Sequence, residues 1–316
     1  MDFSVSVIIP AFNAEKFIEK AVNSALEQPE ITEIIVINDG STDGTLKIAE
    51  RIQKSNPIIK IYHHRNKENK GRSASRNLGI KNASGNFIAF LDADDYYLNN
   101  RFRNDKKIFQ NDINCDGVYN AIGAQFYRVA TTREKDQLEL TTIRENVKPE
   151  ELFDALLAGN KGYFSIDGLT VKRSAFEKVG YFDVSLKVSE DTNLFFKLAL
   201  KCNLKTGIID RPLAIRGVHY DNVFNREDLY KEYRIKMLES IFFWSGKNHI
   251  PIKKIDSILD LIWIIKFKNE EGMINNLKYW GLLFTNNPKA LFTLLSIKYF
   301  PIIRLRKKLF PFLYRP

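Results

Sequence analysis

Three carboxylates crowd together at the end of an apolar run. The run, Phe87–Leu91, contains the aromatic and β-branched residues that are typical of a buried strand, and Asp92, Asp94 and Asp95 follow it at once. Carboxylates at this spacing repel one another and lose hydration unless a cation lies among them. Oxygen ligands favour Mg²⁺ or Mn²⁺, and such ions often bring substrate phosphates with them. The alternative is an ordinary polar turn after the strand, because Asp is common in turns.

A second acidic pair, Glu190 and Asp191, lies farther along the chain after Ser189. Ser189 is expected to cap a helix, which puts both acids in the first turn of that helix. Acids in a first turn complement the helix dipole without any further role. The residue types alone therefore favour a structural interpretation of this pair.

Strand and helix signals alternate over residues 4–92. The predicted strands cover residues 4–10, 34–37, 58–62 and 87–91, and the predicted helices cover residues 17–26, 45–54 and 73–82. Asn13 is expected to cap the first of these helices. This alternation predicts an α/β fold with a mainly parallel, Rossmann-like sheet, helices on both faces, and ligands at the carboxyl ends of the strands.

Three loops with unusual chemistry follow strands of this sheet: Pro10–Asn13, Asn38–Gly44 and Asp92–Asp95. Because they all leave carboxyl ends of parallel strands, we expect them to open on one edge. Neither a Gly-x-Gly-x-x-Gly fingerprint after the first strand nor a P-loop occurs. A metal at Asp92 and Asp94 is the remaining candidate for holding phosphates.

The chain has 316 residues, and 44% of them are hydrophobic, a composition typical of a globular protein. The two cysteines, Cys115 and Cys202, offer neither metal spacing nor a disulfide framework, which fits a reducing cytoplasm. The chain shows no signal peptide and no apolar run long enough to span a bilayer.

The net charge of +10 implies an anionic partner. The last 19 residues contain no acid and six bases: Lys298, Arg304, Arg306, Lys307, Lys308 and Arg315. Large apolar residues lie between these bases: Phe300, Ile302, Ile303, Leu305, Leu309, Phe310, Phe312, Leu313 and Tyr314. This mixture predicts an anchor on an anionic membrane surface, whereas a nucleic-acid arm more often carries polar residues between its bases. Docking of the tail on the protein's own core is the alternative.

Four motifs in order resemble the family 2 glycosyltransferases, which have the GT-A fold. They are Val7–Asn13, Val36–Thr45, Asn69–Gly71 with Ser75–Gly79, and Phe90–Asp95. The resemblance implies an inverting enzyme that uses a nucleotide-sugar donor, most often a UDP-sugar, with Mg²⁺ or Mn²⁺ as cofactor.

The resemblance also implies where the donor binds. Asp39 accepts a hydrogen bond from the base, which suits a pyrimidine imide N–H. The first loop lies along the uracil, with the Phe12 ring available for stacking. Arg76, or Arg72 near it, contacts the base or the diphosphate. The remaining residues implied for the donor site are Pro10, Ala11, Asn13 and Ala93.

The same resemblance assigns the reacting end of the site. Asp94 becomes the direct metal ligand, Asp92 contacts the ribose or reaches the metal through water, and Asp95 supports them. Asp191 becomes the catalytic base, with Glu190 orienting the acceptor. His219 ends an Arg-x-His-like motif that has one extra residue, and it is expected to ligate the metal or touch the diphosphate, with a structural role as the alternative.

The predicted organisation is a GT-A domain over residues 1–220 and a helical extension over residues 221–316. Residues 1–96 form the nucleotide-sugar-binding half of the domain, and residues 97–220 form the acceptor half. Helices rich in aromatic residues are predicted at residues 229–243, 255–267 and 277–300, and Trp244, Trp263 and Trp280 all fall in this part of the chain. Such helices suit a membrane interface, a lid or a dimer contact.

These observations predict a cytoplasmic glycosyltransferase attached peripherally to the inner face of the membrane. The expected acceptor is a glycan or lipid-linked glycan in surface polysaccharide assembly; a homodimer is a further expectation, and nucleic acid is not an expected partner. One rival is a nucleotide-sugar-binding protein without catalysis. Another is a sugar nucleotidyltransferase, which needs a Gly-rich basic loop where this chain has Pro10–Asn13.

Overall fold

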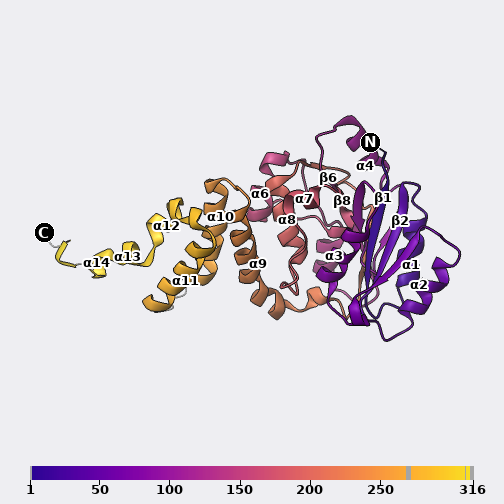
Figure 1. The fold of residues 1–316 in the computed structure, drawn as a ribbon, viewed down its shortest axis with the longest axis horizontal. Coiled ribbons are helices and arrows are strands. Elements are labelled where there is room, and N and C mark those ends of the chain that lie inside the picture. The colour runs from indigo at the N-terminus through magenta and orange to yellow at the C-terminus, as the bar shows by residue number, and fades with distance from the viewer. Residues whose placement is uncertain (1, 268–271, 310, 314–316) are drawn as a thin grey trace. The chain divides into compact units, whose positions relative to one another are not determined.

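A computed structural model describes residues 2–267, 272–309 and 311–313 of the chain (Figure 1). Contacts divide the chain into two compact units, unit 1 (Met1–Asn225) and unit 2 (Arg226–Pro316). Phe310, Tyr314 and Arg315 of the predicted tail lie outside the described residues.

The main sheet of unit 1 has seven strands in the order β3-β2-β1-β4-β8-β6-β9. Their bounds are β1 (Val5–Ala11), β2 (Ile31–Asn38), β3 (Ile59–His63), β4 (Phe87–Phe90), β6 (Gly117–Tyr119), β8 (Leu169–Lys172) and β9 (Leu204–Thr206). Strand β8 runs antiparallel to β4 and β6, and the other neighbouring pairs are parallel. The predicted, mainly parallel sheet is thus confirmed.

Helices cover both faces of this sheet (Figure 1). The helices of unit 1 are α1 (Ile18–Leu26), α2 (Thr45–Gln53), α3 (Arg72–Asn82), α4 (Arg103–Asn111), α5 (Thr132–Leu138), α6 (Pro149–Ala158), α7 (Ala175–Val179) and α8 (Glu190–Lys201). Short 3-10 turns occur at Arg65–Lys67, Ile166–Gly168 and Val223–Asn225.

Alternation along β1 explains how one strand supports both layers. Val5, Val7 and Ile9 join the hydrophobic cluster that includes α1 and α2. Ile8 points to the opposite face, where a Cβ at Gly79 of α3 would collide with its side chain. Burial on both faces is why the strand reads as one continuous apolar run.

A second, three-stranded sheet brings distant residues to the edge where the main sheet ends. It has the order β5-β10-β7, with β5 (Tyr96–Tyr97), β7 (Ile122–Phe126) and β10 (Ala214–Val218). Strand β10 pairs antiparallel with β5. The residues before β5 therefore oppose the end of β10, and the Gly217 amide donates to Asp95 Oδ1 at 2.8 Å.

Two local predictions were wrong. Asn13 does not cap α1, which begins at Ile18 after Phe17; its side-chain oxygen accepts instead from the Thr42 amide at 2.9 Å. Ser189 does precede α8, but its side chain makes no capping hydrogen bond, and its backbone is left-handed at φ 60°.

Unit 2 is helical. It contains α9 (Glu227–Lys247), α10 (Ile252–Ile262), a π-helical turn at Trp263–Phe267, α11 (Met273–Asn286), a 3-10 turn at Pro288–Phe292, α12 (Leu294–Tyr299), α13 (Pro301–Arg304), α14 (Arg306–Leu309) and a last 3-10 turn at Pro311–Leu313. The single helix predicted over residues 277–300 is therefore interrupted, because Pro288 cannot continue α11. No helix among the described residues is long and apolar enough to cross a membrane.

Candidate active site

One cavity of about 670 Å³ opens at the carboxyl edge of the main sheet in unit 1. Ten of the residues predicted for the site line it: Pro10, Ala11, Phe12, Asn13, Asp39, Arg72, Asp92, Ala93, Asp94 and His219. The three loops expected to meet at this edge all contribute to its wall. Among the described residues that line it, Arg76, Glu190 and Asp191 do not occur.

The first two loops are tied to each other by polar contacts. The Asn13 amide donates to Ser41 Oγ at 3.1 Å, and the Ala14 amide donates to Thr45 Oγ1 at 2.7 Å. These bonds, with the one from Thr42 to Asn13, hold the loops at a fixed separation. Phe12 remains 50% exposed, so its ring is open for stacking on a planar ligand.

Asp39 is buried and organises the turn that precedes α3. Its Oδ1 accepts from the Lys70 amide at 2.7 Å, and its Oδ2 accepts from the Gly71 amide at 2.9 Å. Gly71 has φ 83°, a conformation that favours glycine. Each carboxylate oxygen has two lone pairs, so Asp39 retains the capacity to accept one more donor.

His64, for which the sequence indicated no partner, lies beside Asp39. Its Nε2 is 3.4 Å from Asp39 Oδ1 and 2.9 Å from the hydroxyl of Ser75 on α3. The pairing of β2 with β3 brings it there, because Asn38 faces His63 in the register. The sequence alone could not predict the contact of His64 with Asp39, because it depends on which strands pair and in which register.

Two arginines of α3 hold the acids of two distant segments together. Arg76 is 1% exposed; it donates to Asp92 Oδ1 at 2.6 Å and to Glu190 Oε1 at 2.9 Å. The Arg72 guanidinium also contacts Glu190, with its Nε 2.5 Å from Oε1. This arrangement connects the donor side of the site to the start of α8.

The electrostatics of these acids differ. Burial raises the pKa of Asp92, but the charges of Arg76 and Arg72 outweigh it, so its pKa lies below the ordinary value. Burial raises the pKa of Glu190 above its ordinary value, although Arg72 and Arg76 oppose the shift. Asp92 is therefore the firmly ionised member of the pair.

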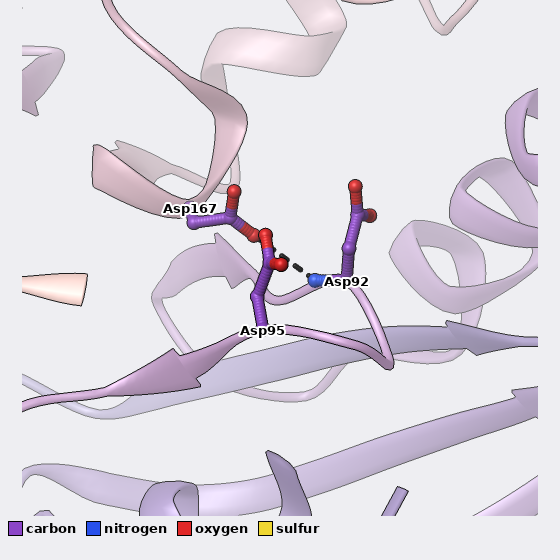
Figure 2. Close-up of side chains that lie close together, drawn as sticks. All are labelled: Asp92, Asp95 and Asp167. Carbon is purple, nitrogen blue, oxygen red and sulfur yellow. Dashed lines mark hydrogen bonds between the residues drawn. The ribbon is translucent and has the colours of Figure 1, made fainter. Parts of the chain in front are cut away.

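Asp92, Asp95 and Asp167 form an acidic cluster whose ligand atoms lie within 4.8 Å of one another. Figure 2 shows the Asp95 and Asp167 carboxylates turned toward each other, whereas the Asp92 carboxylate points away from them. The Asp92 amide donates to Asp167 Oδ1 at 2.9 Å. Burial and the neighbouring acids raise the pKa of Asp95 well above its ordinary value, and burial together with Asp92 raises that of Asp167.

Asp167 is a site residue to which the sequence assigned no role. It is 1% exposed and reaches the cluster because β8 pairs antiparallel with β4, so that Thr170 faces Ala89. Its only sequence signal is an acid directly before an apolar strand. That signal is weak, because such acids are common in turns.

Asp94 and His219 lie in contact although 125 residues separate them. His219 Nε2 is 2.7 Å from Asp94 Oδ2, and the Phe17 ring stacks on the imidazole at 5.2 Å. The hydrogen bond with Asp94 raises the pKa of His219 above its ordinary value. The second sheet produces this contact, because β10 ends at Val218 beside the residues that precede β5.

Three side chains at the wall of the cavity have the ligand types that a hard divalent ion prefers. Asp92, Asp94 and His219 line it, and their side chains are 31%, 26% and 19% exposed. By distance, the group of possible ligands among the described residues is the acidic cluster itself, Asp92, Asp95 and Asp167. Two of its members, Asp95 and Asp167, are buried, and their oxygens accept from Gly217, Asp92 and Ser165.

Asp191 lies at the start of α8, next to Glu190. Its Oδ1 accepts from the Thr192 amide at 2.7 Å and from the Thr192 hydroxyl at 3.4 Å. Its charge helps to raise the pKa values of Arg72, Arg76 and Arg216. Asp191 is thus within electrostatic range of the arginines that flank the site.

Comparisons with known proteins agree with this geometry. The model for glycosyl transferase family 2 matches residues 6–180. The uncharacterized glycosyltransferase EpsJ of Bacillus subtilis is 33% identical over 248 residues, covering 74% of this chain and 68% of its own length. The minor teichoic acid biosynthesis protein GgaA of Bacillus subtilis is 32% identical over 206 residues, covering 62% of this chain and 43% of its own length.

Among solved structures, S. aureus TarS 1-349 in complex with UDP-GlcNAc resembles this chain with a TM-score of 0.65. The two share 18% sequence identity over 96% of this chain and 87% of that chain. At this identity the likeness concerns the fold, and it confirms the GT-A fold with a helical C-terminal region.

Proposed function

The chain belongs to glycosyl transferase family 2, and we propose that it transfers a sugar from a UDP-sugar to an acceptor hydroxyl with inversion at the anomeric carbon. One observation carries this proposal. One cavity is lined by two features. The first is Asp39, a buried carboxylate that can accept a hydrogen bond from a nucleobase, and the second is a partly exposed group of side chains of metal-ligand type, Asp92, Asp94 and His219. A nucleoside diphosphate has a hydrogen-bonding base at one end and metal-binding phosphates at the other, which matches this pair of features.

The donor is proposed to lie along the three strand-end loops. The base stacks on Phe12 and donates its imide N–H to Asp39, whose other bonds fix the turn at Gly71. TarS, which shares the fold, is known in complex with UDP-GlcNAc. That complex supports a UDP-sugar as donor and an N-acetylhexosamine or hexose as the transferred sugar.

Asp92, Asp94 and His219 are proposed to hold Mn²⁺ or Mg²⁺. The ion would neutralise the charge that develops on the departing diphosphate. Arg76 keeps Asp92 ionised and oriented through its 2.6 Å contact, so that this carboxylate is ready to bind the ribose or a metal-bound water.

Asp191 is the proposed base. It accepts the proton of the acceptor hydroxyl while that oxygen forms a bond to C1, and the bond from C1 to the UDP oxygen breaks with its electron pair leaving on UDP. The contacts of Glu190 do not fit the expected role of orienting the acceptor, because its carboxylate is buried on Arg72 and Arg76. We assign Glu190 to positioning those arginines and the adjacent base.

The proposed acceptor is a lipid-linked glycan in surface polysaccharide assembly. The similarity to GgaA, a minor teichoic acid biosynthesis protein, supports a surface polymer. We place the reaction at the cytoplasmic face of the membrane, with the chain attached peripherally through its basic C-terminal region. A membrane-held acceptor would then be presented to the cavity from a surface that the enzyme itself binds.

The test is a panel of UDP- and GDP-sugars with and without Mn²⁺, read by thermal shift and by release of free nucleotide. We expect one UDP-sugar to stabilise the chain only with metal and to release UDP. An Asp191→Asn variant should retain the thermal shift and lose the release. Stabilisation without release in the native chain would indicate a binding protein, and release of pyrophosphate from a nucleoside triphosphate would indicate a nucleotidyltransferase; either result would refute the proposal.

A further inference from the structure

The excess positive charge of the chain is concentrated at its C-terminal end. Residues 272–316 contain eight Lys and Arg and no Asp or Glu, which leaves 40 bases and 38 acids for residues 1–271. The rest of the protein is therefore nearly neutral. A stretch of 45 residues without one acid is unusual, because charged residues of both signs normally mix on a protein surface.

Six large apolar side chains within residues 291–303 of this region are exposed. They form what we call the apolar ridge: Leu291 (51% exposed), Phe292 (70%), Leu294 (78%), Ile297 (53%), Ile302 (42%) and Ile303 (39%). Single exposed apolar residues are normal on any protein, but six within 13 positions are a patch.

Two members of the ridge, Leu294 and Ile297, lie on the side of α12 that the unit does not use for its own packing. Leu295 and Ser296 are buried, and the Leu295 amide donates to Asp256 of α10 at 2.9 Å. Leu294 and Ile297 are three positions apart, so they share a helix face. Helix α12 is thus docked through one side and presents an apolar side to the outside.

Bases lie before, within and after the ridge in the chain. Lys289 is partly exposed, and five bases are exposed: Lys298, Arg304, Arg306, Lys307 and Lys308. The Arg304 guanidinium lies over the Trp263 ring at 4.7 Å, and Trp263 stacks on Tyr299 at 4.5 Å. Trp and Tyr next to cationic groups are typical of the boundary between water and lipid.

We propose that residues 289–308 bind the surface of an anionic bilayer, with the apolar ridge among the acyl chains and the bases on the lipid phosphates. A second copy of the chain fits less well, because a two-fold contact would bring the same cluster of bases against itself. An acidic protein would match the charge but not the apolar ridge in its midst. Lipid with anionic headgroups matches both.

This surface deepens the proposed function, since it names the lipid chemistry through which the enzyme is held near a membrane-borne acceptor. None of the described helices is long and apolar enough to cross a bilayer. Attachment needs neither donor nor metal. The binding of lipid and the transfer of sugar can therefore be tested separately.

The experiment is co-sedimentation of the full chain with vesicles of phosphatidylcholine, with or without 30% phosphatidylglycerol. We expect at least tenfold tighter binding to the anionic vesicles. Phe292→Ser/Leu294→Ser should weaken that binding at least tenfold, whereas Ile113→Ser/Val129→Ser, at positions 83% and 86% exposed in unit 1, should leave it within twofold. Circular dichroism checks that each variant is folded.

A charge test uses two matched lysine pairs. Lys307→Glu/Lys308→Glu should weaken binding at least tenfold, and Lys106→Glu/Lys107→Glu, an exposed adjacent pair on α4, should weaken it much less. UDP release measured without vesicles should be the same in all variants. Equal losses in test and control pairs, or no binding of the native chain, would overturn the proposal; so would a dimer that dissociates in Phe292→Ser/Leu294→Ser while vesicle binding persists. Vesicle binding without any sugar transfer would instead refute the proposed function alone.

Discussion

Two buried groups of charged side chains in unit 1 differ in how their charges balance. One is the acidic cluster, Asp92, Asp95 and Asp167. The other, which we call the closed network, consists of Arg101, Asp105, Asn120 and Thr170. They are neighbours, because Arg101 Nε donates to the Asp167 carbonyl at 3.2 Å. The difference between them shows which buried charges serve the fold and which await a ligand.

The closed network satisfies itself. Arg101 donates to Asp105 Oδ2 at 2.8 Å and to Thr170 Oγ1 at 3.3 Å, and Asn120 donates to Asp105 Oδ1 at 3.0 Å. One positive and one negative charge cancel with no solvent exposure on either residue. Such a network holds α4 against β8 and offers nothing to a ligand.

The acidic cluster does not satisfy itself. Its three carboxylates outnumber the bases beside them: Arg216 lowers the pKa of each from nearby, and Arg76, which contacts Asp92, is shared with Glu190. Burial raises the pKa of Asp105 in the closed network too, but at Asp95 and Asp167 neighbouring acids add to the rise, and the Asp92 carboxylate faces the cavity. An imbalance of charge at the wall of a cavity is typical of functional sites.

The largest effect should come from Asp94, the partly exposed acid next to this cluster. Asp94→Ala removes a proposed metal ligand and the partner of His219, so we expect sugar transfer to fall by about 10³-fold or more, with little change in thermal stability. Asp221→Ala is the matched control, because Asp221 lines the same cavity and is exposed. Normal turnover by Asp94→Ala at saturating donor and Mn²⁺ would remove the metal role.

The closed network should respond in the opposite way. Asp105→Asn leaves the Arg101 charge uncompensated in the core, and the free energy of unfolding should fall by about 3 kcal/mol. Urea denaturation measures this, with the exposed Asp136→Asn as control. Once folded, the variant should keep its turnover number within about threefold. A large loss of turnover with unchanged stability would erase the distinction between the two groups.

Glu190 combines features of both groups. It is paired with arginines, as Asp105 is in the closed network, and it is also next to the proposed base, Asp191. Glu190→Gln keeps the shape but removes the charge that Arg72 and Arg76 share, and we expect turnover to fall about 30-fold while donor binding changes less. The ratio of the changes in kcat and KM is the measurement. A loss of stability alone would assign Glu190 to the fold.

Sequence reasoning reached the parallel half of unit 1 because local patterns determine it. The apolar runs of β1, β2 and β4 and the helical stripe of α1 were recognised, and the rule that parallel strands end at one edge brought Asn13, Asp39 and Asp92 to one cavity. Strand ends shifted by a few residues at most, except that β2 begins at Ile31 rather than Ile34.

The parts that the sequence did not predict depend on long-range pairing. Asp167 joins the cluster only through the antiparallel pairing of β8 with β4, and His64 meets Asp39 only through the register of β2 and β3. In unit 2 the break within residues 277–300 does have a local signal, Pro288, which the prediction of one helix passed over. What the sequence did not show is the tertiary contact beside it, where the buried Asn287 side chain donates to the Phe242 carbonyl at 2.8 Å.

The smallest predicted effect concerns a third buried acid, Glu33, at the opposite edge of the main sheet. It accepts from Ser6 Oγ at 2.6 Å, from Lys60 Nζ at 2.5 Å and from the Ser84 amide at 2.9 Å. Burial raises the pKa of Glu33, but these donors outweigh it, so the folded-state pKa lies below the ordinary value of 4.5. Glu33 is therefore a satisfied acid like Asp105, and it should affect stability alone.

Because the folded-state pKa of Glu33 is lowered, its stabilising contribution is complete above pH 4.5 and is lost as the pH falls through the folded-state pKa. Glu33→Gln should thus cost about 1–2 kcal/mol of unfolding free energy at pH 7, and the difference from the native chain should shrink below pH 4.5. Urea denaturation across this pH range measures it. A difference that does not depend on pH would mean that Glu33 contributes through packing. An effect on donor turnover at pH 7 would show that a satisfied acid far from the cavity also serves the reaction, and charge balance would then no longer separate structural from functional acids.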